Sequence, residues 1–232
     1  MSDKITLILL PGLLCDAALW AHQVEGLADV AQVQVADLSG FDSMAGLAQS
    51  VLDVAPERFA LAGLSMGGYV AQEIMRLAPE RVKRLALLDT NARADLPEQS
   101  ERRSTLMAEA ESGGFAAIPP KLLPALVHPD HLGLSDTVLG MAARVGVQGF
   151  LNQQNAIMGR IDGRAGLSSV DCPALVLCGA DDQLTPVSAH EEMAAAIGAN
   201  ATLVVVPHCG HLSTLEQPDR VTVALRMWLT TD

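Results

Sequence analysis

The sequence predicts an α/β protein built on a mostly parallel sheet of about six strands, with helices on both faces. Short apolar runs alternate with segments of helical spacing through residues 5–89, and the same alternation returns after residue 171. Between these parts the chain keeps helical spacing but contains no convincing strand. Strands that alternate with helices form parallel sheets through right-handed crossovers. We therefore expect a core of residues 1–89 and 171–232, with residues 90–170 inserted as a helical cap.

The first elements follow from apolar pattern and capping residues. Residues 5–10 (Ile-Thr-Leu-Ile-Leu-Leu) are short and almost continuously apolar, which is typical of a strand buried on both faces. Residues 16–28 have helical spacing, and Asp16 is a suitable N-cap. A second strand is expected at about 33–37 and a helix at about 43–54.

The next strand and helix enclose a glycine-rich turn. Residues 58–63 predict the third strand, and the spacing of Val70, Ile74 and Leu77 predicts a helix that ends before Pro79. Residues 84–89 predict the fourth strand. After the insertion we expect strands at 174–178 and 202–206, a helix at 187–197, and a closing helix at 219–229.

Composition excludes several classes of function. The 232 residues are 50% apolar and carry a formal net charge of −12, which disfavours binding to nucleic acid or to anionic membranes. No run approaches the length of a membrane span, and no secretion signal is recognised. The four cysteines form no C-x-x-C pair, so neither a zinc site nor a disulfide framework is indicated. We expect a cytoplasmic monomer or homodimer with reduced thiols.

One short motif carries chemistry. Gly63-Leu-Ser65-Met-Gly67 has the pattern Gly-x-Ser-x-Gly and lies between a predicted strand and a predicted helix. In that context the pattern is typical of a nucleophile elbow, in which a strained turn exposes the serine hydroxyl. The amide of Met66 then faces the reacting carbonyl, at a helix N-terminus that favours negative charge. The alternatives are an ordinary glycine-rich turn from strand to helix and a phosphate-binding loop, but the segment lacks the lysine or the glycine spacing of phosphate-binding loops.

A serine nucleophile needs a base and an acid that orients the base. Two aspartates, Asp181 and Asp182, follow the strand at 174–178, and two histidines, His208 and His211, follow the next strand. The carboxyl ends of parallel strands meet at one edge of a sheet, so these side chains are expected near Ser65. Asp89, at the end of the fourth strand, is another candidate for the acid.

These motifs together resemble the α/β-hydrolase superfamily, in particular the small capped bacterial carboxylesterases and the 3-oxoadipate enol-lactonase-like group. The resemblance covers essentially the whole core and the cap only loosely. It implies the α/β-hydrolase fold. In that family the acid lies three residues after a strand-end glycine and four before a proline, which selects Asp182 by its distance from Gly179 and Pro186. The base follows a glycine, which selects His211 over His208.

The resemblance also implies a second donor for the oxyanion. The loop after the first strand supplies it, and the residue after Gly12 is Leu13, whose backbone amide would donate. Pro11 stands where the family usually has a histidine, so the sequence leaves open how this loop is anchored. Nearby Cys15 is expected to be a small packed residue.

We therefore expect a serine hydrolase that cleaves a carboxylic ester, lactone or thioester of a small molecule, without metal or cofactor. Two alternatives stay open: a lyase or carbon–carbon bond hydrolase with the same three residues, as in the menaquinone-pathway synthase, and a non-catalytic ligand-binding protein. His190 is expected on a solvated helix face. The arginines of the insertion fit either a carboxylate site or ordinary helix surfaces; they are Arg93, Arg102, Arg103, Arg144, Arg160 and Arg164.

Overall fold

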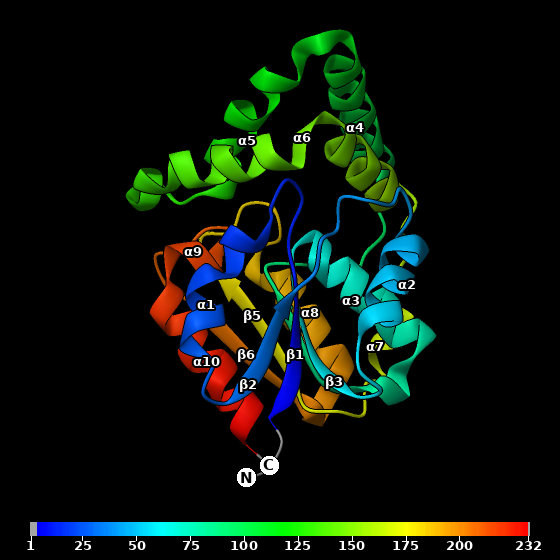
Figure 1. Cartoon of the computed structure of the whole chain (residues 1–232), viewed down its shortest axis with the longest axis vertical. Helices are drawn as coiled ribbons and strands as arrows, with labels where there is room; N and C mark the ends of the chain where they lie inside the picture. Colours follow the sequence, from blue (N-terminus) through cyan, green and yellow to red (C-terminus); the bar gives the residue numbers. More distant parts are fainter. Residues whose placement is uncertain (1–3, 232) are drawn as a thin grey trace.

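Six parallel strands form the centre of the computed structural model, which describes residues 4–231 (Figure 1). Their order across the sheet is β2-β1-β3-β4-β5-β6. This is the predicted fold class. The strands are β1 (Ile5–Leu10), β2 (Ala31–Val35), β3 (Phe59–Leu64), β4 (Val82–Leu88), β5 (Ala174–Gly179) and β6 (Ala201–Val206).

Helices connect successive strands and fill the long gap between β4 and β5. They are α1 (Ala21–Gly26), α2 (Met44–Val54), α3 (Met66–Leu77), α4 (Pro97–Glu109), α5 (Ile118–Leu126), α6 (Ser135–Met158), α7 (Arg164–Leu167), α8 (Val187–Ile197), α9 (Ser213–Glu216) and α10 (Pro218–Thr230). Within residues 4–231, none of these helices is long and apolar enough to cross a membrane.

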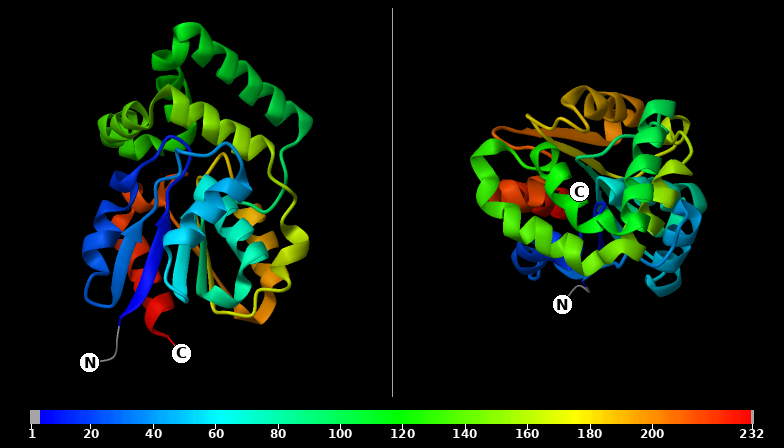
Figure 2. Two further views of the ribbon diagram at one scale, coloured as in Figure 1. Left: turned by 45° about the vertical axis from the view of Figure 1, so that its right-hand side comes forward. Right: turned by 90° about the horizontal axis from the view of Figure 1, so that it is seen from above.

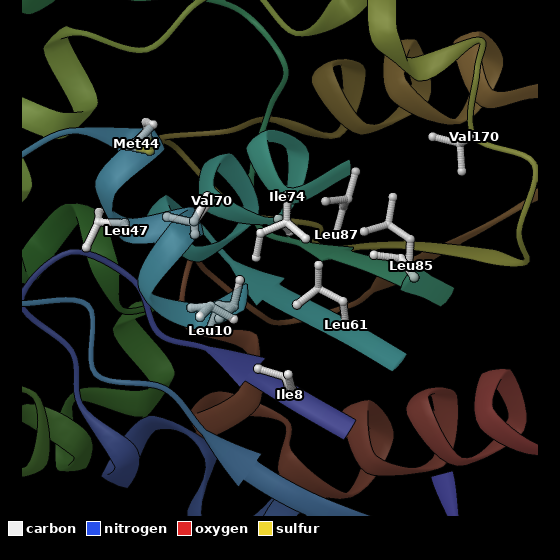
Figure 3. Close-up of a cluster of buried hydrophobic side chains, with 14 of the residues drawn as sticks. Ile8, Leu10, Met44, Leu47, Leu61, Val70, Ile74, Leu85, Leu87 and Val170 are labelled. Carbon is white, nitrogen blue, oxygen red and sulfur yellow. The ribbon is translucent and has the colours of Figure 1, made fainter. Parts of the chain in front are cut away.

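The alternation of side chains along each strand creates two apolar layers. Ile8 and Leu10 of β1 pack with α2 and α3 on one face (Figure 3), whereas Leu7 and Leu9 pack on the opposite face against residues such as Leu225 of α10. Because both faces are covered, β3 and β5 are buried along their whole length. Each fully buried leucine contributes about 1.5–3 kcal/mol of burial free energy.

Residues 90–170, here called the helical insert, lie over the carboxyl ends of the strands (Figures 1 and 2). A small apolar cluster holds the helices of the insert together and includes Ile118 and Phe150. Leu14, from the loop after β1, belongs to the same cluster. The insert therefore packs directly on the loop that follows the first strand. We propose that it acts as the cap of the molecule.

Two of the predicted elements were placed inaccurately. The second strand covers residues 31–35 rather than 33–37, because Ala31 already pairs with Ile5 of β1. The predicted helix at 16–28 is a 3₁₀ turn, Ala17–Trp20, followed by the short α1. Asp16 is its N-cap as predicted, since the side chain accepts a hydrogen bond of 2.9 Å from the Ala18 amide.

Glycines allow three backbone segments to meet at the serine turn, residues 63–67. A Cβ at Gly63 would lie 2.2 Å from the carbonyl oxygen of Gly67, and one at Gly67 would lie 2.1 Å from that of Leu10. Between them Ser65 has φ 54°, in the left-handed region. A non-glycine residue there costs on the order of 1–3 kcal/mol, and the surrounding contacts must compensate for it.

We expect Gly67→Ala to lower the free energy of unfolding by about 2–4 kcal/mol, because the rigid backbone of the neighbouring strand leaves no space for a methyl group. Thermal denaturation would record this as a decrease of roughly 5 to 15 °C in Tm. Gly166→Ala in α7 is the matched control, since a Cβ there meets nothing within 4 Å. Equal stability of the two variants would contradict the close-packing argument.

Candidate active site

The strand order places the two loops nearest to Ser65 on either side of a crevice. The chain moves from β1 to β2 on one side and then returns to place β3 on the other side of β1. The loops after β1 and β3 therefore diverge and leave a crevice at the sheet edge, the usual ligand position in such sheets. A Cβ at Gly12 would lie 3.4 Å from the Cβ of Ser65, so the two loops are in contact across this crevice.

The structure brings Ser65, His211 and Asp182 into one hydrogen-bonded row. Ser65 Oγ lies 2.8 Å from His211 Nε2, and His211 Nδ1 lies 2.8 Å from Asp182 Oδ2. His211 is 2% exposed and Asp182 5% exposed, so solvent reaches this row mainly at the serine. In this arrangement a neutral imidazole donates from Nδ1 to the carboxylate and accepts at Nε2 from the hydroxyl.

Asp182 is held as a carboxylate by its own loop. Its Oδ1 accepts from the amides of Leu184 at 2.8 Å and Thr185 at 3.0 Å, and its Oδ2 accepts from the Thr185 hydroxyl at 2.6 Å. Burial alone would raise the pKa of Asp182, but the charge of His211 and these hydrogen bonds outweigh burial and hold it below its usual range.

Carboxylates also surround His211. Burial disfavours the imidazolium, but the charge and hydrogen bond of Asp182, followed by the charges of Asp89 and Glu216, raise the pKa of His211 above its ordinary value. Glu216 fixes the histidine loop as well, because it accepts hydrogen bonds from the amides of Gly210 at 2.9 Å and Leu212 at 3.0 Å. Sequence analysis did not identify Glu216, which looks like an ordinary helix residue.

Asp89, the other candidate for the acid, contacts different groups. Its Oδ1 accepts from the Gly179 amide at 3.0 Å, and its Oδ2 accepts from the hydroxyl and the amide of Ser213. Burial, then the charge of Asp182, raise the pKa of Asp89. Asp89 thus joins the loop that precedes Asp182 to the loop that carries His211, and within residues 4–231 it makes no hydrogen bond with the imidazole ring.

The remaining sequence candidates lie outside the row. Asp181 is half-exposed and lies 3.7 Å from His128, and the ring of His208 packs edge-on against the same histidine.

The prediction that His190 lies on a solvated helix face was wrong, because His190 is fully buried and its Nε2 accepts a hydrogen bond from the Thr90 amide at 3.0 Å. Burial first, and then the charge of Asp16, raise the pKa of the packed Cys15 thiol to about 12.

The amides of Leu13 and Met66 make no hydrogen bond with any group in residues 4–231. The loop that carries Leu13 has an anchor that its sequence does not reveal. The Leu14 amide donates to Gln153 Oε1 at 2.9 Å, and Gln153 Nε2 donates to Leu38 O at 3.2 Å. Gln153 is buried in α6, so the helical insert supplies the anchor.

Strained backbone concentrates at the same edge. Within the described part of the chain, the non-glycine residues with positive φ are Leu14, Ser65, Asp89 and His208, which follow β1, β3, β4 and β6. Such conformations persist only where the surroundings hold them, and they cluster at functional sites.

A pocket of about 290 Å³ opens above Ser65 between the sheet edge and the helical insert. Leu106 of α4, Leu126 of α5 and Ile157 at the end of α6 form apolar parts of its wall. The polar part includes three arginines, and Leu13 and His211 lie at its base. The site therefore has room for a small molecule beside the serine.

Comparisons with known proteins agree with this architecture. The model of the alpha/beta hydrolase family matches residues 7–224. Pimeloyl-[acyl-carrier protein] methyl ester esterase from Nitrosomonas europaea is 29% identical, over 92% of this chain and 91% of that protein. A thermophilic esterase from Thermogutta terrifontis, solved with malate bound, superimposes with a TM-score of 0.88 at 31% identity, over 98% and 90% of the two chains. The enol-lactonase from Burkholderia xenovorans LB400 gives 0.90 at 25% identity, over 99% and 92%.

The raised pKa of His211 sets an expected pH dependence. A base must be neutral to accept a proton, so kcat/KM for an uncharged ester should fall as the pH decreases through the pKa of His211. Its midpoint should lie above the ordinary histidine value of 6.5. Residual activity of Asp182→Asn should show a lower midpoint, because the carboxylate no longer stabilises the imidazolium. A wild-type midpoint below 6.5 would contradict this electrostatic description.

Gln153→Leu should lower kcat about 10- to 100-fold with a smaller change in KM, because the loop that carries the Leu13 amide loses its hydrogen-bonded anchor. Steady-state kinetics on an uncharged ester would measure both constants. Gln148→Leu, an exposed substitution on the same helix, is the control. If both variants keep the kcat of the unmodified protein, Gln153 does not position the loop.

Proposed function

This chain belongs to the alpha/beta hydrolase family, and from that premise we propose that it cleaves the carboxylic ester of a small molecule through an acyl-enzyme formed on Ser65. The observation that carries the proposal is the row of hydrogen bonds from Ser65 through His211 to Asp182, with both distances at 2.8 Å. The relatives that are named esterase and enol-lactonase act on carboxylic esters or lactones, which supports the same reaction class for this chain.

In the first half of the reaction, His211 Nε2 accepts the proton of Ser65 as the serine oxygen attacks the ester carbonyl. The carbonyl oxygen becomes an oxyanion that accepts hydrogen bonds from the amides of Leu13 and Met66. The tetrahedral intermediate expels the alcohol, which takes the proton from His211, and the acyl group stays on Ser65. Asp182 keeps the imidazole oriented and stabilises its charged form.

In the second half, water enters the place of the alcohol and gives its proton to His211. The resulting hydroxide attacks the acyl carbonyl, and the same two amides bind the second oxyanion. The bond between the acyl group and Ser65 breaks, and His211 returns the proton to the serine. One ester and one water have become one acid and one alcohol, and the enzyme is regenerated.

The first test is intact mass after incubation with a fluorophosphonate, which phosphonylates an activated serine. We expect a single adduct on the unmodified protein and none on Ser65→Ala, because the mutant lacks the nucleophile. Ser213→Ala does not serve as a control here, since Ser213 binds Asp89; Ser112→Ala, in an exposed part of the insert, does. An adduct that persists in Ser65→Ala would overturn the assignment.

Product analysis with a panel of esters and thioesters completes the test. A hydrolase incorporates one oxygen from ¹⁸O-labelled water into the acid product, whereas a lyase incorporates none. The lyase alternative would be favoured by two results together. The fluorophosphonate would label Ser65 although no ester is hydrolysed, and the protein would convert another substrate to products that contain no ¹⁸O.

A further inference from the structure

The pocket above Ser65 is positively charged in a chain that is negatively charged as a whole. Its charged lining, apart from His211, consists of Arg102, Arg103 and Arg160, and no aspartate or glutamate of the described residues lines it. The whole chain carries 27 acidic residues against 15 lysines and arginines. A surface of average composition would therefore contain more carboxylates than arginines, so the charge of the pocket lining is opposite to that of the chain as a whole.

One buried carboxylate partly balances two of the arginines. Asp95 Oδ2 accepts from Arg103 Nε at 2.7 Å, and Asp95 Oδ1 lies 2.6 Å from Arg160 Nη1. The side chain of Asp95 is 1% exposed and that of Arg160 6% exposed, so the charges lie largely out of water. Two guanidinium groups with one carboxylate leave an excess of one positive charge. Arg102, on the exposed side of the pocket, adds a second without an ion pair among the described residues.

The guanidinium groups of buried Arg160 and partly buried Arg103 keep donors for a ligand. Arg103 Nη1 donates to Gln154 at 2.9 Å, and Arg160 donates from Nε and Nη1 to the carbonyl oxygens of Arg93 and Ile157. The Nη2 group of each makes no hydrogen bond with residues 4–231. Both side chains are therefore fixed in position while part of each planar donor edge stays free, an arrangement suited to a carboxylate.

Tyr69 links this cluster to the serine. The Arg160 guanidinium lies over its ring, 4.3 Å from the centroid, and the Tyr69 hydroxyl accepts from Asn91 Nδ2 at 3.3 Å. Tyr69 follows Ser65 by one turn of α3, a rise of about 6 Å along the helix. Arg102, Arg103 and Arg160 line the same pocket as Ser65, so a ligand in that pocket can contact both the arginines and the serine.

We propose that the preferred substrates are esters that carry a second, free carboxylate, which Arg102, Arg103 and Arg160 bind while the ester carbonyl lies against Ser65. A monoester of a short dicarboxylic acid has this chemistry. The proposal rests on the ester hydrolysis proposed above and adds the class of substrate. If the arginines only fastened the insert to the core, charge on the substrate would make no difference.

The experiment compares pairs of methyl esters of equal chain length. One member of each pair is the monomethyl ester of succinate, glutarate or adipate, and the other is the methyl ester of the corresponding uncharged monocarboxylic acid. We expect kcat/KM to be at least tenfold higher for the charged member of the best pair, mainly through a lower KM, and the ratio to decline with added salt. A ratio near one for all pairs would overturn the proposal.

Substitutions assign the effect to the arginines. Arg102→Gln should reduce the charged-to-uncharged ratio about tenfold, and Arg103→Lys should reduce it because lysine keeps the charge but loses the planar fork. Arg220→Gln removes the same charge from an exposed position on α10, outside the pocket, and should leave the ratio unchanged. Fluorophosphonate labelling of Ser65 in each variant shows that the fold and the nucleophile persist.

Two further results distinguish a failure of the carboxylate subsite from a failure of the proposed function. Hydrolysis of uncharged esters with no preference for a carboxylate would overturn the subsite and leave the proposed function intact, whereas absence of all ester hydrolysis would overturn the proposed function first.

Glutarate and inorganic phosphate are then compared as inhibitors of the fluorophosphonate labelling of Ser65. Protection by glutarate that is lost in Arg102→Gln supports the carboxylate subsite; protection by phosphate alone would assign the site to a phosphate-bearing ligand and overturn it.

Discussion

The close contact of three backbones at the end of β3 is the constraint on which the rest of the site depends. A Cβ at Gly63 would collide with the backbone of Gly67, and a Cβ at Gly67 would collide with the carbonyl of Leu10. Between the two glycines, Ser65 has a positive φ. The same packing brings the loop after β1 against Ser65, and Leu13 of that loop lines the same pocket as the serine. The strained backbone at Ser65 and the position of the loop that carries Leu13 are thus consequences of one packing arrangement, which the apolar layers on both faces of the sheet support.

Buried carboxylates organise the other half of the site. Asp89 binds the loops of β5 and α9, and Glu216 binds the two amides that flank His211. Each therefore has a structural role and an electrostatic one, because the charges of both residues raise the pKa of His211. A low-dielectric site makes such fixed charges effective and removes the need for solvent to reorganise during the reaction.

The helical insert does more than cover the carboxyl ends of the strands. Gln153 anchors the loop of the predicted oxyanion donor, and α4 and the segment after α6 bring arginines to the pocket. A displacement of the insert would therefore alter both the amide geometry and the charge of the pocket. In the proposed function, this arrangement connects binding of the substrate's free carboxylate with the reaction at Ser65.

The sequence by itself determined the α/β class, the succession of strands and the serine turn, because these depend on local apolar runs and on glycines adjacent in the chain. It also placed two aspartates and two histidines near the serine, since parallel strands end at one edge, and the resemblance to the α/β-hydrolases selected Asp182 and His211 among them. Only the tertiary structure revealed the structural contacts of Asp89, the burial of His190, the anchor at Gln153 and the sharing of Asp95 by two arginines. These contacts join residues from eight to more than a hundred positions apart. No local pattern encodes them, because tertiary packing, within the core, within the insert and between the two, decides which polar groups meet.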